Sequence, residues 1–166
     1  MKKTHILIVI YSVLTFSVSF AQPTNQNLVV LQNVDQYKDF AIDSRTNIRD
    51  TNHLINDLKN QIIRAINRHL SLEQNMHITI LDVDMAGVVS PSYDARRIRS
   101  HIDSSLLAFN YKIFDANGNI IHQDHVVLEE RFLDKKSLQL NRFRNSYFKY
   151  ELVMFSKWLK NLDITQ

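Results

Sequence analysis

The sequence predicts an α+β domain in which a mostly antiparallel four-stranded sheet carries two helices packed on one face. Three observations lead to this fold class: two long stretches with helical spacing of apolar residues, four short stretches rich in β-branched and aromatic residues, and one turn of hairpin type. Their order along the chain is β-α-β-β-β-α. This order favours helices gathered on one face of an antiparallel sheet.

The strands are recognised by β-branched residues and by alternation. Leu28–Leu31 is a short apolar run, and Met76–Val83 is a strand with Met76, Ile78 and Ile80 on one face. Leu106–Phe114 alternates again and is followed by the turn Asp115–Asn119, which contains a glycine. Asp at the start of a turn and Gly at a position of positive φ are typical of a hairpin, so Ile120–Glu129 is predicted to return beside the preceding strand.

Two amphipathic helices are predicted. From Ile48 to Leu70 apolar residues recur mainly in steps of three or four, which places them on one stripe that can cover a sheet. The predicted stripe consists of Ile48, Ile55, Leu58, Ile62, Ile66 and Leu70. The second helix is predicted within Ser137–Leu162, and Trp158 is expected to be anchored between this helix and the sheet. Its apolar stripe consists of Phe148, Leu152, Phe155, Leu159 and Leu162.

The first residues have the organisation of a secretory signal peptide. Met1–His5 is positively charged, Ile6–Val18 is an apolar run of 13 residues, and Ser19–Ala21 places small residues before a cleavage point. We expect cleavage between Ala21 and Gln22 and a periplasmic product without a transmembrane segment. A retained N-terminal anchor is the alternative, but the apolar run is short of the roughly 20 residues that a membrane span needs.

Cleavage would leave a flexible leader at residues 22–27 and a single α+β domain at residues 28–166. The chain contains no cysteine, so no disulfide is expected and stability must come from packing. Loss of Lys2 and Lys3 reduces the 20 basic residues to 18, against 17 acidic ones. The mature charge is therefore nearly balanced.

The most unusual stretch is Asp82-Val-Asp84-Met-Ala-Gly87, where a strand meets two carboxylates and one of the two glycines of the chain. In a continuing strand both carboxylates would share the face of Ile78 and Ile80, where they could act in acid/base chemistry or bind a hard cation. The other interpretation is structural. The strand ends, and the carboxylates accept hydrogen bonds from the exit loop or pair with Arg96, Arg97 or Arg99 just downstream.

The segment from residue 131 to 160 holds eight basic residues, interleaved with aromatic ones, against Asp134 and Glu151. In an exported protein this pattern points to an anionic envelope surface rather than to nucleic acid. An ordinary amphipathic helix with lysines in solvent is the other explanation. No nucleic-acid partner is expected.

No motif of a nucleophilic, nucleotide-binding or zinc-dependent enzyme is present in the sequence. His122 and Asp124 would share a strand face, but two ligands do not make a metal site. No cofactor, metal or catalytic residue is therefore assigned, and an enzyme is less favoured than a binding protein.

Further motifs follow one another along the chain: Tyr37-x-Asp39 before the first helix, Arg97-Ile-Arg99 after the acidic motif, a strand with Tyr111, and Tyr150-Glu151 followed by Trp158. Together with Asp82-Val-Asp84-Met-Ala-Gly87 they resemble a family of small exported envelope proteins known as domain of unknown function 3016. The resemblance covers nearly all of the mature chain, and it implies the same fold and compartment without implying an activity. Ser104-Ser105 departs from the family, which tends to have a proline there. The candidates for a binding site are the residues that carry the resemblance: Tyr37, Asp39, Asp82, Asp84, Gly87, Arg97, Arg99, Tyr111, Tyr150, Glu151 and Trp158.

Two functions are consistent with the sequence. The first is a non-catalytic periplasmic module that binds an envelope protein or an anionic envelope surface. The second is an acid/base or metal-assisted hydrolase centred on Asp82 and Asp84, which predicts a concave pocket where these carboxylates meet histidines or arginines.

Overall fold

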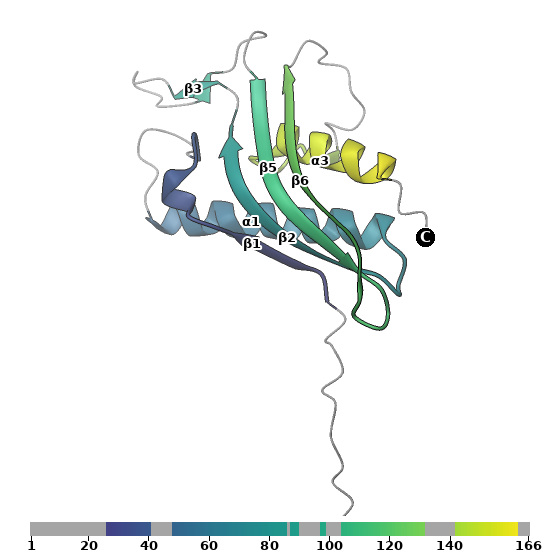
Figure 1. Cartoon of the computed structure of the whole chain (residues 1–166). Coiled ribbons are helices and arrows are strands. Elements are labelled where there is room, and N and C mark those ends of the chain that lie inside the picture. Colours follow the sequence, from purple (N-terminus) through teal and green to yellow (C-terminus); the bar gives the residue numbers. More distant parts are fainter. Residues whose placement is uncertain are drawn as a thin grey trace, which may run out of the picture.

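The computed structural model describes residues 26–40, 48–85, 87–89, 97–98, 104–131 and 142–162. The predicted α+β fold and the order β-α-β-β-β-α are confirmed (Figure 1). The predicted signal peptide lies outside the described residues. The main elements are β1 (Leu28–Leu31), α1 (Ile48–His69), β2 (Asn75–Asp84), β5 (Ser104–Phe114), β6 (Ile120–Arg131) and α3 (Lys149–Asn161).

In the described part of the chain the main sheet has four strands in the order β1-β2-β5-β6. β1 is parallel to β2, whereas the other neighbours are antiparallel. Both helices lie on one face, and the view in Figure 1 is from the open face of the sheet, with α1 behind it. Three short elements were not predicted: a 3-10 helix, η1 (Val34–Gln36), and the antiparallel pair β3 (Val88–Val89) and β4 (Arg97–Ile98).

The core lies between the helices and the inner face of the sheet. α1 contributes a stripe close to the predicted one, except that Leu54 is fully buried while Ile55 is only partly buried. The sheet contributes alternate residues of each strand, and Phe109 lies at the centre in contact with Phe155 of α3. The buried residues of α1 are Leu54, Leu58, Ile62, Ala65 and Ile66.

β2 contains one extra residue, Leu81. Ile80 lies opposite Phe109 and Asp82 lies opposite Ala108, so Leu81 has no partner in β5 and forms a bulge. A shift of one residue moves all following side chains to the other face of a sheet. Val83 is consequently buried at 0% exposure, in the core beside Ile80. Asp82 and Asp84 therefore point to the open face.

The predicted hairpin between β5 and β6 is confirmed. The Asp115 carboxylate accepts hydrogen bonds from the backbone N–H of Asn117 (2.9 Å) and of Asn119 (2.8 Å). Gly118 has φ 83°, a conformation that residues with a Cβ adopt at a cost. The side-chain and backbone donors of Asn119 lower the pKa of Asp115, which matches its role as the acceptor that closes the turn.

The second predicted helix is interrupted before α3. Arg142 is helical, Phe143–Phe148 forms turns and a bend, and α3 starts at Lys149. The reason is Ser146, whose hydroxyl donates to Asp57 of α1 (2.7 Å) and accepts from the N–H of Phe148 (3.1 Å). This side chain satisfies a donor outside the helix and ties the turn to α1.

Trp158 packs where it was predicted. It is partly buried, and its ring lies 4.9 Å from that of Phe109 and 5.0 Å from that of Tyr111, measured between centroids. Asn27, which the sequence placed in the leader, donates to Asn67 (2.6 Å) and accepts from the N–H of Met76 (2.8 Å). The described helices include none with the length and hydropathy of a membrane span.

Deletion of Leu81 should leave the domain folded. It removes the extra residue, so Ile80 and Asp82 follow one another opposite Phe109 and Ala108, and Val83 still faces the core while Asp82 and Asp84 face the open side. Deletion of Val83 is the matched contrast, because with or without a bulge it turns one carboxylate into the core, at a cost of several kcal/mol against a net stability of roughly 5–15 kcal/mol for a domain. Circular dichroism during urea titration measures both variants. A Leu81 deletion that fails to fold would contradict this role of the bulge.

Candidate functional site

The candidate residues fall into three groups that do not share one surface. The first group, around Asp82 and Asp84, lies at the end of β2 on the open face of the sheet. The second, around Glu151, lies at the same end of the sheet but on the helix face. The third, around Tyr111, lies six residues from Ser105 along β5, about 20 Å away at the rise of a strand.

The segment Tyr37–Asp39 extends the edge of the sheet beyond β1. After η1, the N–H of Asp39 donates to the carbonyl of Val83 (3.1 Å), and the carbonyl of Asp39 accepts from the N–H of Met85 (3.2 Å). These bonds make a parallel bridge between Asp39 and Asp84. The segment thus resumes the pairing with β2 that η1 interrupts, and two motifs far apart in sequence lie side by side.

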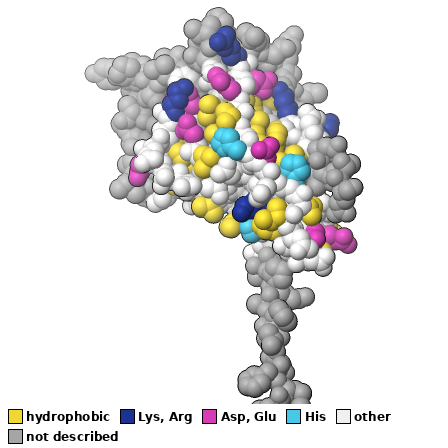
Figure 2. Space-filling model, viewed as in Figure 1, with side chains coloured by type: hydrophobic (Ala, Val, Ile, Leu, Met, Phe, Trp, Pro, Cys, Tyr) yellow, Lys and Arg dark blue, Asp and Glu magenta, His cyan; other side chains and the backbone are white. Residues whose placement is uncertain are grey.

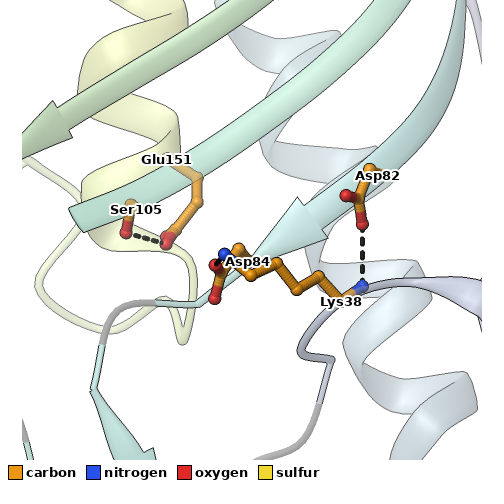
Figure 3. Close-up of polar contacts among 5 residues, drawn as sticks. All are labelled: Lys38, Asp82, Asp84, Ser105 and Glu151. Carbon is orange, nitrogen blue, oxygen red and sulfur yellow. Dashed lines mark hydrogen bonds and ion pairs between the residues drawn. The ribbon is translucent and has the colours of Figure 1, made fainter. Parts of the chain in front are cut away.

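Lys38 is the residue that both carboxylates of the motif contact (Figure 3). Asp82 accepts a hydrogen bond from the backbone N–H of Lys38 (2.8 Å), and Asp84 pairs with its ammonium group (2.5 Å). The Asp84 carboxylate raises the pKa of Lys38. The structural interpretation of the motif thus gains support from an upstream partner. The strand does not end before the carboxylates, however, as that interpretation supposed.

Tyr37 holds the segment Tyr37–Asp39 against β2. Its hydroxyl donates to the carbonyl of Ile80 (3.0 Å), at the residue before the bulge, and its side chain is buried. Its ring meets Phe40 edge-on, and Phe40 stacks on Phe148 just before α3. Burial, with a smaller contribution from the charge of Asp82, raises the pKa of Tyr37. The tyrosine is neutral at physiological pH and serves as a hydrogen-bond donor.

Gly87 follows the motif with φ 100°, which explains why a glycine stands there. The backbone of Arg97 in β4 pairs with Val89 of β3. Arg96 and Arg99, which were also considered as partners of the carboxylates, lie outside the described residues.

Glu151 is fully buried on α3 and accepts a hydrogen bond from the hydroxyl of Ser105 at the start of β5 (2.5 Å; Figure 3). Ser105 and Leu106 are neighbours, and Leu106 lies opposite Asp84. The sheet therefore separates the two acidic groups. Tyr150, the neighbour of Glu151, lies under the ammonium group of Lys149 at 4.9 Å.

The third group is aromatic. The hydroxyl of Tyr111 and Nδ1 of His122 are 2.8 Å apart, and the two rings are stacked. Trp158 covers Tyr111 from α3. Burial and the charge of Asp124 raise the pKa of Tyr111, so it also is a neutral hydroxyl. His122 was considered only as a metal ligand on the basis of the sequence, and its contact with Tyr111 was not predicted.

The hydrolase hypothesis predicts a pocket at Asp82 and Asp84. Two hollows of the described surface, of about 330 Å³ and about 280 Å³, are lined by other residues. One lies between β6 and α3, and the other lies beside the β5–β6 turn. Among the described residues, no three histidine or acidic side chains are arranged to hold a metal ion. In this geometry Asp82 holds the backbone of Lys38 and Asp84 holds its side chain.

Replacing the carboxylates should therefore affect stability unequally. Asp82→Ala removes the acceptor of a backbone N–H and should cost about 1 kcal/mol, as net hydrogen bonds do. Asp84→Ala breaks a pair with an exposed lysine, so its effect should be smaller and should vanish in high salt. Thermal unfolding measures both variants. Divalent cations that stabilise the wild type but neither variant would instead reveal a cation site.

The comparisons with known proteins concern the family and the fold. No curated protein matches the chain. Among solved structures, the hypothetical protein CT253 from Chlamydia trachomatis is similar over 81% of this chain and 92% of its own, at 8% identity and a TM-score of 0.31. The model of the family described as protein of unknown function DUF3016 matches residues 26–161. The match covers the whole described domain, and the chain belongs to this family.

Proposed function

We propose that the chain is an exported, non-catalytic binding module of the cell envelope and that it binds a partner protein through the open face of its sheet. The observation that carries this proposal is the set of exposed apolar side chains on that face. Val127 of β6 is 54% exposed, and Leu28 and Val30 of β1 are 49% and 41% exposed. Figure 2 shows hydrophobic side chains across this face, with histidine and acidic residues among them.

The register of the sheet identifies the charges of the open face. Asp82, Asp84 and Glu129 face this side together with Lys112 and Arg131, and Lys38 pairs with Asp84. Glu130 lies opposite Ser105 and faces the helices, where it pairs with Lys157. The open face is therefore mixed in charge, and a partner segment that combines apolar side chains with both acidic and basic ones matches such a surface.

The contacts of Asp82 and Asp84 support binding over hydrolysis. Both carboxylates hold the segment that extends β1, as a scaffold requires. Lys38 itself is 67% exposed and lies at the edge of the open face, where it adds a positive charge near the acidic ones. The segment that the motif positions is thus part of the proposed binding surface.

Export is tested by the mass of the mature protein. We expect cleavage between Ala21 and Gln22, because the small residues before this bond fit signal peptidase specificity. Intact-mass measurement of the protein recovered from the native cell envelope gives the N-terminus directly. A protein that retains Met1 would contradict export by this route.

Binding through the open face is tested with a photoreactive residue. Placed at Val127 or at Val30, it should crosslink in the native cell to the same protein, because both positions lie exposed on the proposed surface. Asn60, exposed on α1, is the matched control position and should not give this product. Val127→Glu should abolish the product obtained from position 30. Equal crosslinking from Asn60, or none from the open face, would overturn the proposal.

A further inference from the structure

The helical segments carry a net positive charge. Residues 48–69 and 142–162 contain nine basic and three acidic side chains, and one of these acids, Glu151, is fully buried. It does not offset the positive charge at the surface. The basic residues are Arg49, Lys59, Arg64, Arg68, Arg142, Arg144, Lys149, Lys157 and Lys160, and the acidic ones are Asp50, Asp57 and Glu151.

Four exposed basic side chains gather where the end of α1 lies near the segment before α3 and the end of α3. Arg64 and Arg68 are one turn apart on α1, and α3 packs beside α1 on the same face of the sheet (Figure 1). We name these side chains the helical basic patch: Arg64, Arg68, Arg142 and Lys160. Partial burial, followed by the charges of Arg142 and Arg64, lowers the pKa of Arg68. Burial and the charges of Arg142, Arg68 and Lys160 also lower the pKa of His69, which therefore adds no charge to the patch at neutral pH. The members of the patch repel one another.

No carboxylate in the described part of the chain forms an ion pair with a member of this patch. Other bases of the protein do have such partners. Lys157 pairs with Glu130 at 2.8 Å, and Lys38 pairs with Asp84. Repulsion between like charges destabilises the folded chain, and an external anion removes this cost.

We propose that the helical basic patch binds the phosphate groups of an anionic membrane surface. Guanidinium groups match phosphate oxygens with paired donors, and three arginines are present. The patch residues are exposed and come from three different segments, so the bases are spread over a face. A lipid bilayer presents many phosphates in a plane, which suits such a face. This inference rests on the proposed export, but it concerns the face opposite to the proposed protein-binding surface.

The mature protein should co-sediment with vesicles made of an equal mixture of phosphatidylglycerol and phosphatidylcholine, and not with phosphatidylcholine alone. Binding should fall steeply as salt rises, because the contacts are electrostatic. Arg64→Gln combined with Arg68→Gln should weaken partitioning about 25-fold, since each base near an anionic surface contributes about 1 kcal/mol. The matched control is Lys112→Gln combined with Arg131→Gln, which changes the net charge equally on the sheet side and should bind like the wild type. Melting curves establish that both variants are folded.

Three results would overturn the inference. They are equal binding to vesicles with and without phosphatidylglycerol, equal losses in the two double variants, and displacement from vesicles by inorganic phosphate at constant ionic strength. The last would identify a free phosphate as the ligand. None of these results bears on crosslinking from Val127, so failure here is distinguishable from failure of the proposed function.

Discussion

Both faces of the molecule depend on which residues of β2 point toward the core and which point toward the open face. One extra residue, Leu81, lets the first half of the strand bury Ile78 and Ile80 and the second half bury Val83. The same shift places Asp82 and Asp84 in reach of Lys38. An apolar core and a polar strand end are thus built from one continuous strand. The edge segment that carries Tyr37 and Asp39 then pairs along the shifted half.

The sheet divides the polar residues that the sequence offered as candidates for a site. Asp84 and Leu106 lie opposite each other, and Ser105, the neighbour of Leu106 in β5, points the other way to meet Glu151. The acidic candidates therefore belong to two structures with a sheet between them. One organises the edge of the open face, and the other joins α3 to β5 inside the core. The two groups do not meet in one site.

Local patterns were sufficient to predict the fold. The helical steps in α1 and α3 and the alternation in β5 each depend on neighbours within a few residues, so periodicity reveals them. The faces of Asp82 and Asp84 were not predictable, because Leu81 and Val83 continue an apolar run and nothing local marks the extra residue. The partners Lys38 and Ser105 were missed because each is more than 40 residues away from the carboxylate it contacts. Such pairs arise from strand order and helix packing, which spacing does not encode. The start of α3 was missed for a similar reason, since Ser146 is held by Asp57 of α1.

The excess of basic side chains on the helices makes one side of the described domain more positive than the other. Near a charged boundary such a molecule experiences a torque, so that its orientation is biased before any contact forms. With the helices turned toward a negative boundary, the open face of the sheet would be directed away from that boundary. A partner confined to the same thin layer would then meet this face in two dimensions, where encounters are more frequent than in bulk. The net charge alone does not reveal this property, because it depends on where the charges lie and not on their sum.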